Sequence, residues 1–267
     1  MRLTAVIFDW AGTVIDHGSR APASALQSVF DSAGVPVSVA EARLSMGIAK
    51  RDHIRAILDL PRVAEAWMGR HGITPDEAVV DSLYKEFLPR QTQFLGERSR
   101  LIAGIPNMVE ALRSRGLRIG STTGYTRPML EYLLEEAREQ GFTPDCAIVP
   151  GDVPGGGRPA PWMCYLNAIH LAVSPLWSMV KIGDTPSDVE EGLNAGMWTI
   201  GVTRTGNEVG LTEDEWEATG AAQKAKLLAG AGRRLTAAGA HYVLESAAEC
   251  LDVLSEIDDR MRAGERP

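Results

Sequence analysis

The sequence is short of cysteine and of long apolar runs. Its 267 residues include three cysteines, Cys146, Cys164 and Cys250, with no Cys-x-x-Cys spacing among them. This favours isolated thiols over a disulfide framework or a zinc site. No apolar run approaches the roughly 18 residues of a membrane helix. A strand is expected almost at Met1, which leaves no room for a signal peptide. We therefore expect a cytoplasmic protein that does not bind membranes.

An excess of basic residues is also missing. The formal net charge is -8, and no basic run is interleaved with aromatic residues. This charge repels nucleic acid, so we expect no nucleic-acid partner. An anionic ligand would have to be held by local cations, backbone N–H groups or a metal ion.

Strand and helix patterns alternate along most of the chain. Apolar, β-branched segments predict strands at residues 3–8, 117–122, 146–149, 179–182, 198–202 and 242–244. Amphipathic helical patterns separate these segments. Strands that alternate with crossover helices predict an α/β fold with a doubly wound, parallel, Rossmann-like sheet.

One long region interrupts this alternation with helices alone. Helical patterns are expected at residues 38–46, 50–58, 61–71 and 75–93, as in the spacing of Ile54, Ile57 and Leu58. No strand pattern occurs among them. We predict an all-helical cap domain at residues 19–98, inserted into a discontinuous catalytic core formed by residues 1–18 and 99–267.

Polar side chains follow three of the predicted strands. Asp9 and Thr13 follow the first, residues 121–123 bring hydroxyl groups at the second, and Asp184 and Asp188 follow a later one. Carboxylates from different strands make an oxygen-rich site suited to Mg²⁺. Each aspartate could instead cap a helix, and for Asp184 alone the two roles are equally supported. Asp9 ends an apolar strand and needs a partner or a metal ion to offset its desolvation.

These motifs resemble those of the haloacid dehalogenase superfamily. The resemblance rests on Asp9-x-x-x-Thr13, the later hydroxyl, and Gly183-Asp184-x-x-x-Asp188. The superfamily's first motif normally has a second aspartate, which protonates an oxygen leaving group. Ala11 occupies that position here. With no acid at this position, an ordinary phosphatase activity is disfavoured.

A second resemblance is narrower and covers essentially the whole chain. It is to the phosphonoacetaldehyde hydrolase (phosphonatase) family, in which a cap lysine forms a Schiff base with the substrate aldehyde. The matching segments are residues 9–13, 46–53 and 121–127. The resemblance assigns the Schiff base to Lys50. Without it, Lys50 would be taken for a solvated surface lysine.

The chemistry explains why such a lysine is needed. Breaking a P–C bond expels a carbanion, and a protonated imine at the neighbouring carbon accepts its electrons. Lys50 must then be neutral near pH 7, which desolvation or a neighbouring cation can achieve. His53 lies one helical turn away and could be that cation, shuttle protons, or simply be a polar cap residue.

The resemblance also implies the remaining catalytic roles. Asp9 would be the nucleophile that forms an aspartyl-phosphate. Mg²⁺ would be held by Asp9, the Ala11 carbonyl and Asp184, with Asp188 supporting them from a second layer. Arg158 would offset charge between Asp9 and the phosphonate, with Lys181 as the competing cation.

Further residues are expected to contact the substrate. Gly12 would let the backbone approach the phosphoryl oxygens, and Thr123 would donate to one of them unless Thr122 does so. The expected substrate-binding set is Gly12, Thr13, Met46, Gly47, Thr123, Gly124, Tyr125 and Arg158. Ser19 occupies the neighbourhood where the family can have a thiol, so no thiol role carries over.

We therefore expect hydrolysis of the small molecule phosphonoacetaldehyde to acetaldehyde and phosphate. The alternatives are a haloacid dehalogenase-type phosphatase for a small phosphate ester, and a non-catalytic phosphonate-binding protein. The family resemblance also implies a homodimer joined through the cap domains. Trp67 and Met68 offer apolar surface for it, unless they belong to the cap's own core.

Overall fold

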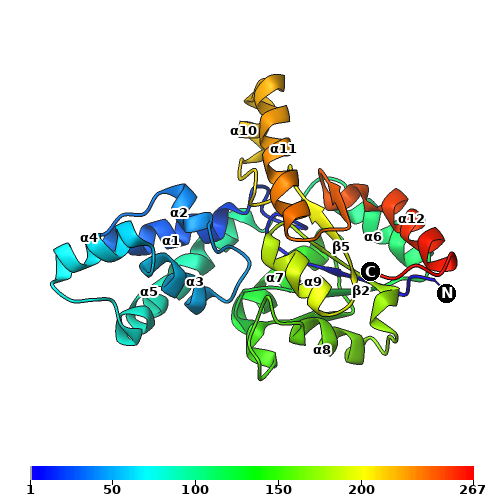
Figure 1. The fold of residues 1–267 in the computed structure, drawn as a ribbon, viewed down its shortest axis with the longest axis horizontal. Helices are drawn as coiled ribbons and strands as arrows, with labels where there is room; N and C mark the ends of the chain where they lie inside the picture. The colour runs from blue at the N-terminus through cyan, green and yellow to red at the C-terminus, as the bar shows by residue number, and fades with distance from the viewer. Residues whose placement is uncertain (1) are drawn as a thin grey trace.

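A computed structural model describes residues 2–267, which form one six-stranded sheet with helices around it (Figure 1). Every strand pair is parallel, and the strand order is β3-β2-β1-β4-β5-β6. The predicted doubly wound α/β fold is confirmed. The strands are β1 (Ala5–Phe8), β2 (Arg118–Thr122), β3 (Cys146–Ile148), β4 (Met179–Gly183), β5 (Trp198–Val202) and β6 (Tyr242–Leu244).

The helices fall into two groups along the chain. Those between β1 and β2 are α1 (Arg20–Ser32), α2 (Val39–Arg43), α3 (Lys50–Leu58), α4 (Pro61–His71), α5 (Glu77–Arg98) and α6 (Ile105–Ser114). Those that follow β2 are α7 (Arg127–Glu139), α8 (Trp162–His170), α9 (Pro186–Asn194), α10 (Glu213–Ala218), α11 (Ala221–Ala237) and α12 (Cys250–Arg262). Short 3₁₀ turns precede α8, β4 and α12 and are named η1 (Pro150–Asp152), η2 (Leu176–Ser178) and η3 (Ala247–Glu249).

The two faces of the sheet are covered by different helices. Successive side chains of a strand point to opposite faces. Ala5 and Ile7 of β1 pack in a cluster with residues of α8, whereas Val6 and Phe8 pack with residues of α6, α7 and α12. Because all four β1 residues are fully buried, this strand is the centre of the core.

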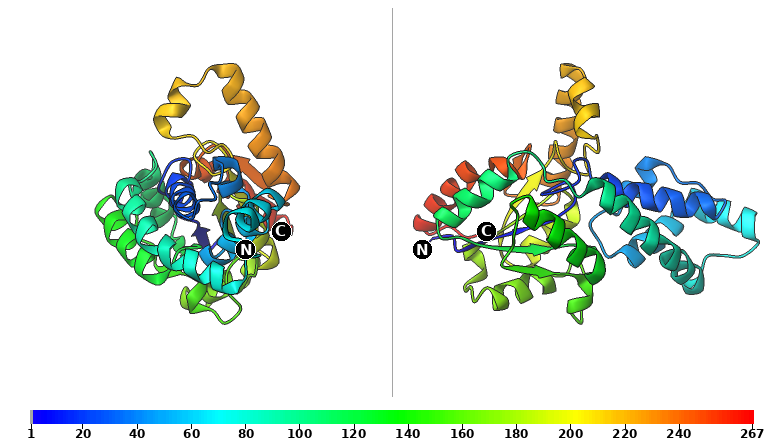
Figure 2. Two further views of the ribbon diagram at one scale, coloured as in Figure 1. Left: turned by 90° about the vertical axis from the view of Figure 1, so that its left-hand side faces the viewer. Right: turned by 180° about the vertical axis from the view of Figure 1, so that it is seen from behind.

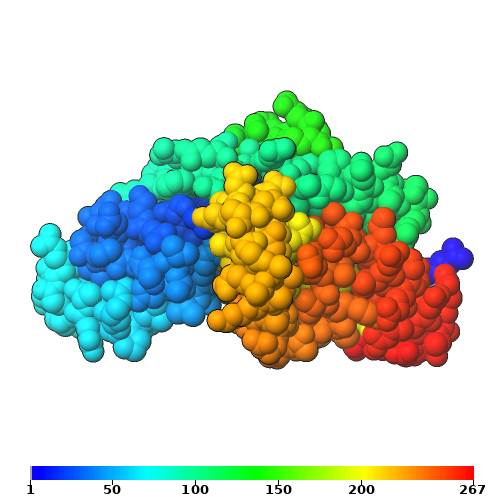
Figure 3. Space-filling model, turned by 90° about the horizontal axis from the view of Figure 1, so that it is seen from above, coloured from blue at the N-terminus to red at the C-terminus, as the bar shows by residue number. Residues whose placement is uncertain are grey.

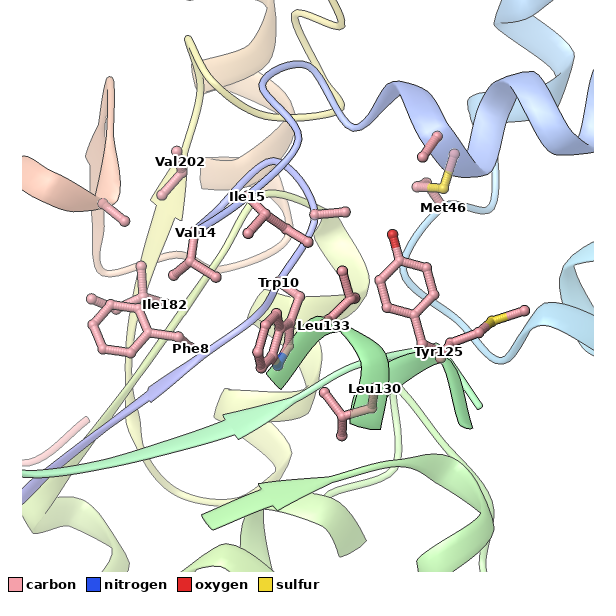
Figure 4. Close-up of a cluster of buried hydrophobic side chains, with 14 of the residues drawn as sticks. Phe8, Trp10, Val14, Ile15, Met46, Tyr125, Leu130, Leu133, Ile182 and Val202 are labelled. Atoms are coloured by element: carbon pink, nitrogen blue, oxygen red, sulfur yellow. The ribbon is translucent and has the colours of Figure 1, made fainter. Parts of the chain in front are cut away.

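Aromatic rings fill the core just beyond the end of β1. Phe142 meets Trp10 edge-on at 5.4 Å between ring centroids and Phe8 at 6.1 Å. Figure 4 shows this cluster continuing past Trp10 to Tyr125, whose hydroxyl points toward Met46. The packing therefore fixes the turn after β1 relative to the segment that carries Met46.

Helices α1 to α5 form a separate layer at one end of the molecule (Figures 1 and 2). Helix α1 packs along α5, and α3 packs against both α4 and α5. The chain enters and leaves this layer through two adjacent segments: Ile102 N donates to Val14 O at 2.9 Å, and Ile15 bridges to Leu101. Trp67 belongs to the core of this layer, whereas Met68 is 44% exposed.

Helices α10 and α11 form a hairpin that projects from the sheet (Figure 1). Seen from above, it stands between the α1–α5 layer and the C-terminal helix (Figure 3). Trp216, Val209 and Ala231 form a small apolar cluster at its base. The helical pattern of residues 212–231 predicts helices in this segment, and α11 continues beyond it to Ala237.

The strand order brings the expected functional residues together. Strand β1 lies between β2 and β4, so the segments that follow these three strands meet at one edge of the sheet. This is where parallel α/β sheets bind ligands. Asp9, Thr123 and Asp184 are the residues directly beyond these strands. No helix within residues 2–267 is long and apolar enough to cross a membrane.

We predict that Phe142→Ala destabilises the protein by about 3–5 kcal/mol, because it removes a fully buried ring and leaves a cavity beside Trp10. Urea unfolding followed by circular dichroism measures the change. Met68→Ala, at an exposed apolar residue, is the control and should stay within about 0.5 kcal/mol. An equal loss in the two variants would contradict this account of the core.

Candidate active site

The turn after β1 fixes the carboxylate of Asp9. The Asp9 N–H donates to Ile182 O at 2.9 Å, and Val14 N donates back to Trp10 O at 2.8 Å, which closes a tight turn. Gly12 within this turn has φ +79°, and a Cβ there would collide with the carboxylate of Asp184. Glycine is therefore required both by the left-handed backbone and by the close approach of Asp184.

Three buried carboxylates meet beyond the strand ends. One oxygen each of Asp9, Asp184 and Asp188 lies within 4.8 Å of the other two. Burial, followed by the charge of Asp188, raises the pKa of Asp9, while burial and Asp9 raise that of Asp184 well above its usual range. Burial also acts on Asp188, but Arg158 and Lys181 outweigh it and lower its pKa. The ionised forms of Asp9 and Asp184 are therefore disfavoured in this buried cluster.

Arg158 is the centre of a buried network. Its Nη2 donates to Asp9 Oδ1 at 2.7 Å, its Nη1 lies 2.9 Å from Asp188 Oδ1, and its Nε donates to Glu191 Oε2 at 2.9 Å. The same Nη2 donates to Thr122 O at 2.8 Å. With its side chain 1% exposed, this guanidinium has no freedom to turn away from Asp9.

Lys181 supports the network from behind rather than contacting Asp9. Its Nζ lies 2.8 Å from Asp188 Oδ1 and 3.4 Å from Glu191 Oε2. Of the two cations considered from the sequence, Arg158 is thus the one that pairs with Asp9. Thr122 likewise points into the network, donating to Glu191, while Thr123 lines the cavity beside Asp9.

Sequence reasoning missed several residues of the site. Glu191 could have been found, because it lies one helical turn after Asp188 on the predicted helix. Arg43 could not, since its partners are distant in the chain: Nη1 donates to Asn207 O at 2.7 Å and Nη2 to Gly18 O at 2.9 Å. The backbone N–H of Asn207 in turn donates to Asp184 Oδ2 at 2.7 Å.

The loop between α2 and α3 closes over the strand ends. Ser187 Oγ donates to Met46 O at 3.0 Å, and Arg158 Nη1 donates to Gly47 O at 3.2 Å. Gly47 has φ +96°, and a Cβ there would collide with Thr185. A Cβ on Gly124 would lie 2.5 Å from Ile48 O. The two glycines permit a contact that larger residues would prevent.

This loop places Lys50 at the start of α3, facing the carboxylates. Lys50 is 5% exposed, and burial lowers its pKa to about 8 although the charge of Asp9 acts in the opposite direction. Its Nζ lies over the ring of Tyr125, 5.2 Å from the centroid. An amine with this pKa is neutral in an appreciable fraction of molecules near neutral pH.

His53 lies behind Lys50, and of its three possible roles its surroundings disfavour that of a cation. Its side chain is fully buried, and burial together with the charge of Lys50 lowers its pKa to about 3. His53 is therefore neutral near pH 7. Desolvation is the largest cause of the lowered pKa of Lys50, and the charge of Arg158 acts in the same direction, so a cationic histidine is not required.

Asp9 and Lys50 line the same small cavity of about 20 Å³. The other residues of its wall are Ala11, Ser19, Pro22, Met46, Gly47, Thr123, Gly124, Tyr125, Arg158, Asp184 and Thr185. Ten of the residues expected at the site are thus brought together. Gly12, Thr13, His53 and Asp188 lie outside this wall, and the buried hydroxyl of Thr13 has no hydrogen-bond partner within residues 2–267.

The carboxylate cluster fits Mg²⁺. Four buried carboxylates (Asp9, Asp184, Asp188 and Glu191) face two buried cations, Arg158 and Lys181, so a divalent ion would balance the remaining charge. Asp188 uses one oxygen for both cations and the other for Thr185 Oγ1 at 2.6 Å. Asp9 and Asp184 are therefore better placed as direct ligands, with Asp188 supporting them.

We predict that Mg²⁺ raises the melting temperature of the protein and that Asp184→Asn abolishes this rise. Asn keeps an acceptor for the Asn207 N–H but removes the charge that a metal ion would offset. Thermal unfolding with and without Mg²⁺ measures both effects. Without the metal, Asp184→Asn should be more stable than the wild type, because an ionised Asp184 is costly to bury. An Mg²⁺-dependent rise that survives in the variant would contradict the assignment.

Comparisons with known proteins agree with this geometry. Residues 3–196 match the family model of the haloacid dehalogenase-like hydrolases. The chain is 46% identical over 263 residues to the phosphonoacetaldehyde hydrolase of Nitratidesulfovibrio vulgaris, covering 98% of this chain and 94% of that protein. It is 43% identical over 258 residues to the phosphonoacetaldehyde hydrolase of Bacillus cereus, covering 97% of each.

A solved structure is similar over the whole length. The crystal structure of a phosphonoacetaldehyde hydrolase-like protein from Oleispira antarctica superposes with a TM-score of 0.98 at 40% identity, covering 100% of this chain and 96% of that one. Its likeness extends to the α1–α5 layer as well as the sheet. The chain therefore belongs to the haloacid dehalogenase-like hydrolases and, among them, to the phosphonoacetaldehyde hydrolase family.

Proposed function

We propose that this enzyme hydrolyses the P–C bond of phosphonoacetaldehyde, giving acetaldehyde and phosphate. One observation carries the proposal: Lys50, a buried amine with a pKa of about 8, shares a cavity with Asp9. At the position where a phosphatase would carry its general acid, this chain has Ala11. The relatives named phosphonoacetaldehyde hydrolase support the substrate.

In the proposed reaction, the neutral amine of Lys50 attacks the aldehyde carbon and water leaves, which forms an imine. The carboxylate of Asp9 then attacks phosphorus. The electrons of the P–C bond move into the protonated imine, so the leaving group is an enamine rather than a carbanion. Water hydrolyses the aspartyl-phosphate, and the enamine returns to an imine that is hydrolysed to acetaldehyde.

Other residues would orient these groups. Arg158 holds the Asp9 carboxylate and is itself held by Glu191, so the nucleophile approaches phosphorus in one orientation. Thr123 and the backbone at Gly12 are proposed to contact the phosphoryl oxygens, with Thr13 supporting that turn. Met46, Gly47, Gly124 and Tyr125 would surround the aldehyde. His53, being neutral, is left with a proton-transfer or packing role.

Mg²⁺ would be held by Asp9, the Ala11 carbonyl and Asp184, with Asp188 behind them. When bound, the ion would offset negative charge on the phosphonate and on Asp9. Arg158 already pairs with three carboxylates, so the charge that it is proposed to offset between Asp9 and the phosphonate would need the ion as well.

Residues 19–98 are proposed to act as a cap domain on a core of residues 1–18 and 99–267. A cavity of about 20 Å³ holds about one water molecule, so the substrate cannot enter unless the α1–α5 layer moves away. The segment where the chain enters the layer has positive φ at Asp16, Gly18 and Ser19. A hinge there would open the site.

We also propose that the protein is a homodimer joined through the cap domains, as the family resemblance implies. The exposed large apolar side chains support this location. Of the six that occur in the described part of the chain, four lie in residues 19–98: Val39, Leu44, Met68 and Ile73.

The decisive test of the function is borohydride reduction in the presence of phosphonoacetaldehyde. We expect a stable adduct on Lys50, located by peptide mass spectrometry, and loss of activity. Lys50→Arg should form no adduct and should lose at least about 10³-fold in kcat, because it keeps the charge but not the nucleophilic amine. Lys85→Arg, on an exposed part of α5, is the matched control and should behave as the wild type.

Three outcomes would overturn the proposed function. The first is full activity without labelling after borohydride treatment. The second is hydrolysis of p-nitrophenyl phosphate that is indifferent to Lys50→Arg, which would favour a phosphatase. The third is the absence of any turnover, which would favour a phosphonate-binding protein.

The lowered pKa of Lys50 also predicts a stability effect. A lysine with a pKa of about 8 when folded and 10.5 when unfolded costs about 3 kcal/mol wherever both states are protonated, below pH 8. Lys50→Met should therefore be more stable than the wild type by about 2–3 kcal/mol at pH 7. The gain should shrink as the pH rises from 8 to 10.5, since the folded wild type no longer has to bury the charge.

Urea unfolding between pH 6 and pH 10 measures this gain. Lys85→Met is the control and should show no such pH dependence. A gain from Lys50→Met that stays constant up to pH 10 would show that packing, and not charge, is its cause.

A further inference from the structure

A second cavity adjoins Lys50. It has a volume of about 240 Å³ and lies between the start of α3, Tyr84 of α5, and the loops that follow β2 and β3. We call it the vestibule. It shares three residues with the Asp9 cavity, namely Lys50, Gly124 and Tyr125. These residues therefore form the wall between the two cavities.

The wall includes the reactive amine of Lys50. Lys50 Nζ lies over the Tyr125 ring at 5.2 Å from its centroid, and the two side chains are 5% and 2% exposed. Lys50 thus lines both the Asp9 cavity and the vestibule. The vestibule reaches solvent at Gly151 and Asp152, which are both exposed.

The charges of the vestibule suit a neutral molecule rather than an anion. Arg51 is paired with Glu77 at 2.7 Å and Asp81 at 2.8 Å. Arg127 is paired with Asp152. Both guanidinium groups on its wall are therefore already compensated, in contrast to the site of the proposed metal ion. Phosphate has little to bind there, whereas a small aldehyde or water meets no charge barrier.

We propose that the vestibule is the port through which a small neutral aldehyde leaves Lys50 and through which water reaches it. This inference rests on the proposed function. In the step concerned, water adds to the imine carbon, the C–N bond to Lys50 breaks with proton transfer to nitrogen, and acetaldehyde and the free amine result. No oxidant or reductant is involved.

Separate exits follow from the sizes of the two cavities. The Asp9 cavity, at about 20 Å³, holds about one water, so phosphate must leave by movement of the α1–α5 layer. The vestibule, at about 240 Å³, accommodates an aldehyde of three heavy atoms without such movement. The aldehyde can therefore exchange with solvent while phosphate stays enclosed beside Asp9.

The test fills the vestibule from two of its walls. Gly151→Trp adds a ring where a Cβ meets nothing within 4 Å, and Thr126→Trp adds one at the loop after β2. Gly69→Trp, on α4, also meets open space and is the matched control. Circular dichroism and melting temperature establish that each variant is folded.

Two rates are measured on each full-length variant. The first is the rate of borohydride-trapped adduct formation on Lys50 with acetaldehyde alone, and the second is phosphate release in a single turnover of phosphonoacetaldehyde. We expect both vestibule variants to slow trapping at least fivefold while phosphate release stays within twofold of the wild type. Gly69→Trp should change neither rate.

An unchanged rate of adduct formation on Lys50 in both folded vestibule variants would overturn the proposal that the vestibule is a port. So would a fall in phosphate release that matches the fall in trapping, since the two halves would then share one route. A wild-type protein that forms no adduct at all would instead defeat the proposed function, which the first rate reveals before any variant is made.

Discussion

The ion pair between Arg158 and Asp9 is the constraint on which the rest of the site depends. Arg158 comes from the loop before α8, yet it contacts the end of β1, two carboxylates of α9 and the carbonyl of Gly47. One buried guanidinium thus joins four segments of the chain. Breaking such a contact leaves buried charges without a partner, which is more costly than the net worth of the pair. The Asp9 carboxylate is therefore held in place before any ligand arrives.

This arrangement also divides the cations between two tasks. Arg158 and Lys181 pair with the buried carboxylates, whereas Lys50 has no ion-pair partner among the described residues and lies desolvated against Tyr125. Burial can then lower the pKa of Lys50 even though negative charges lie across the cavity. Arg158 suits the first task because an arginine stays protonated when buried, and Lys181 stays protonated beside it because burial is outweighed by Asp188 and Glu191, which raise its pKa. Within residues 2–267, Lys50 lacks such partners, so burial can lower its pKa.

The sequence predicted most of the fold, and the parts of the site that local pattern encodes. Strands such as β5 (Trp198–Val202) were found at their observed bounds, because a buried parallel strand is a short apolar run between turns. Helix α5 was expected to end at residue 93 but continues to Arg98, since α1 packs along it. Asp9 and Asp184 stood at strand ends, whereas the contact of Arg43 with Asn207 joins residues with no shared local pattern.

The position of Ala11 in the structure also bears on the pKa of Lys50. It lines the cavity that holds Asp9 and Lys50, so a carboxylate at this position would be a further acid beside four buried ones. Its charge would favour the protonated form of Lys50 and raise the pKa of that amine. The acid that a phosphatase uses would thus oppose the neutral lysine that imine formation requires. Keeping Lys50 neutral therefore requires both its burial and the absence of a carboxylate at position 11.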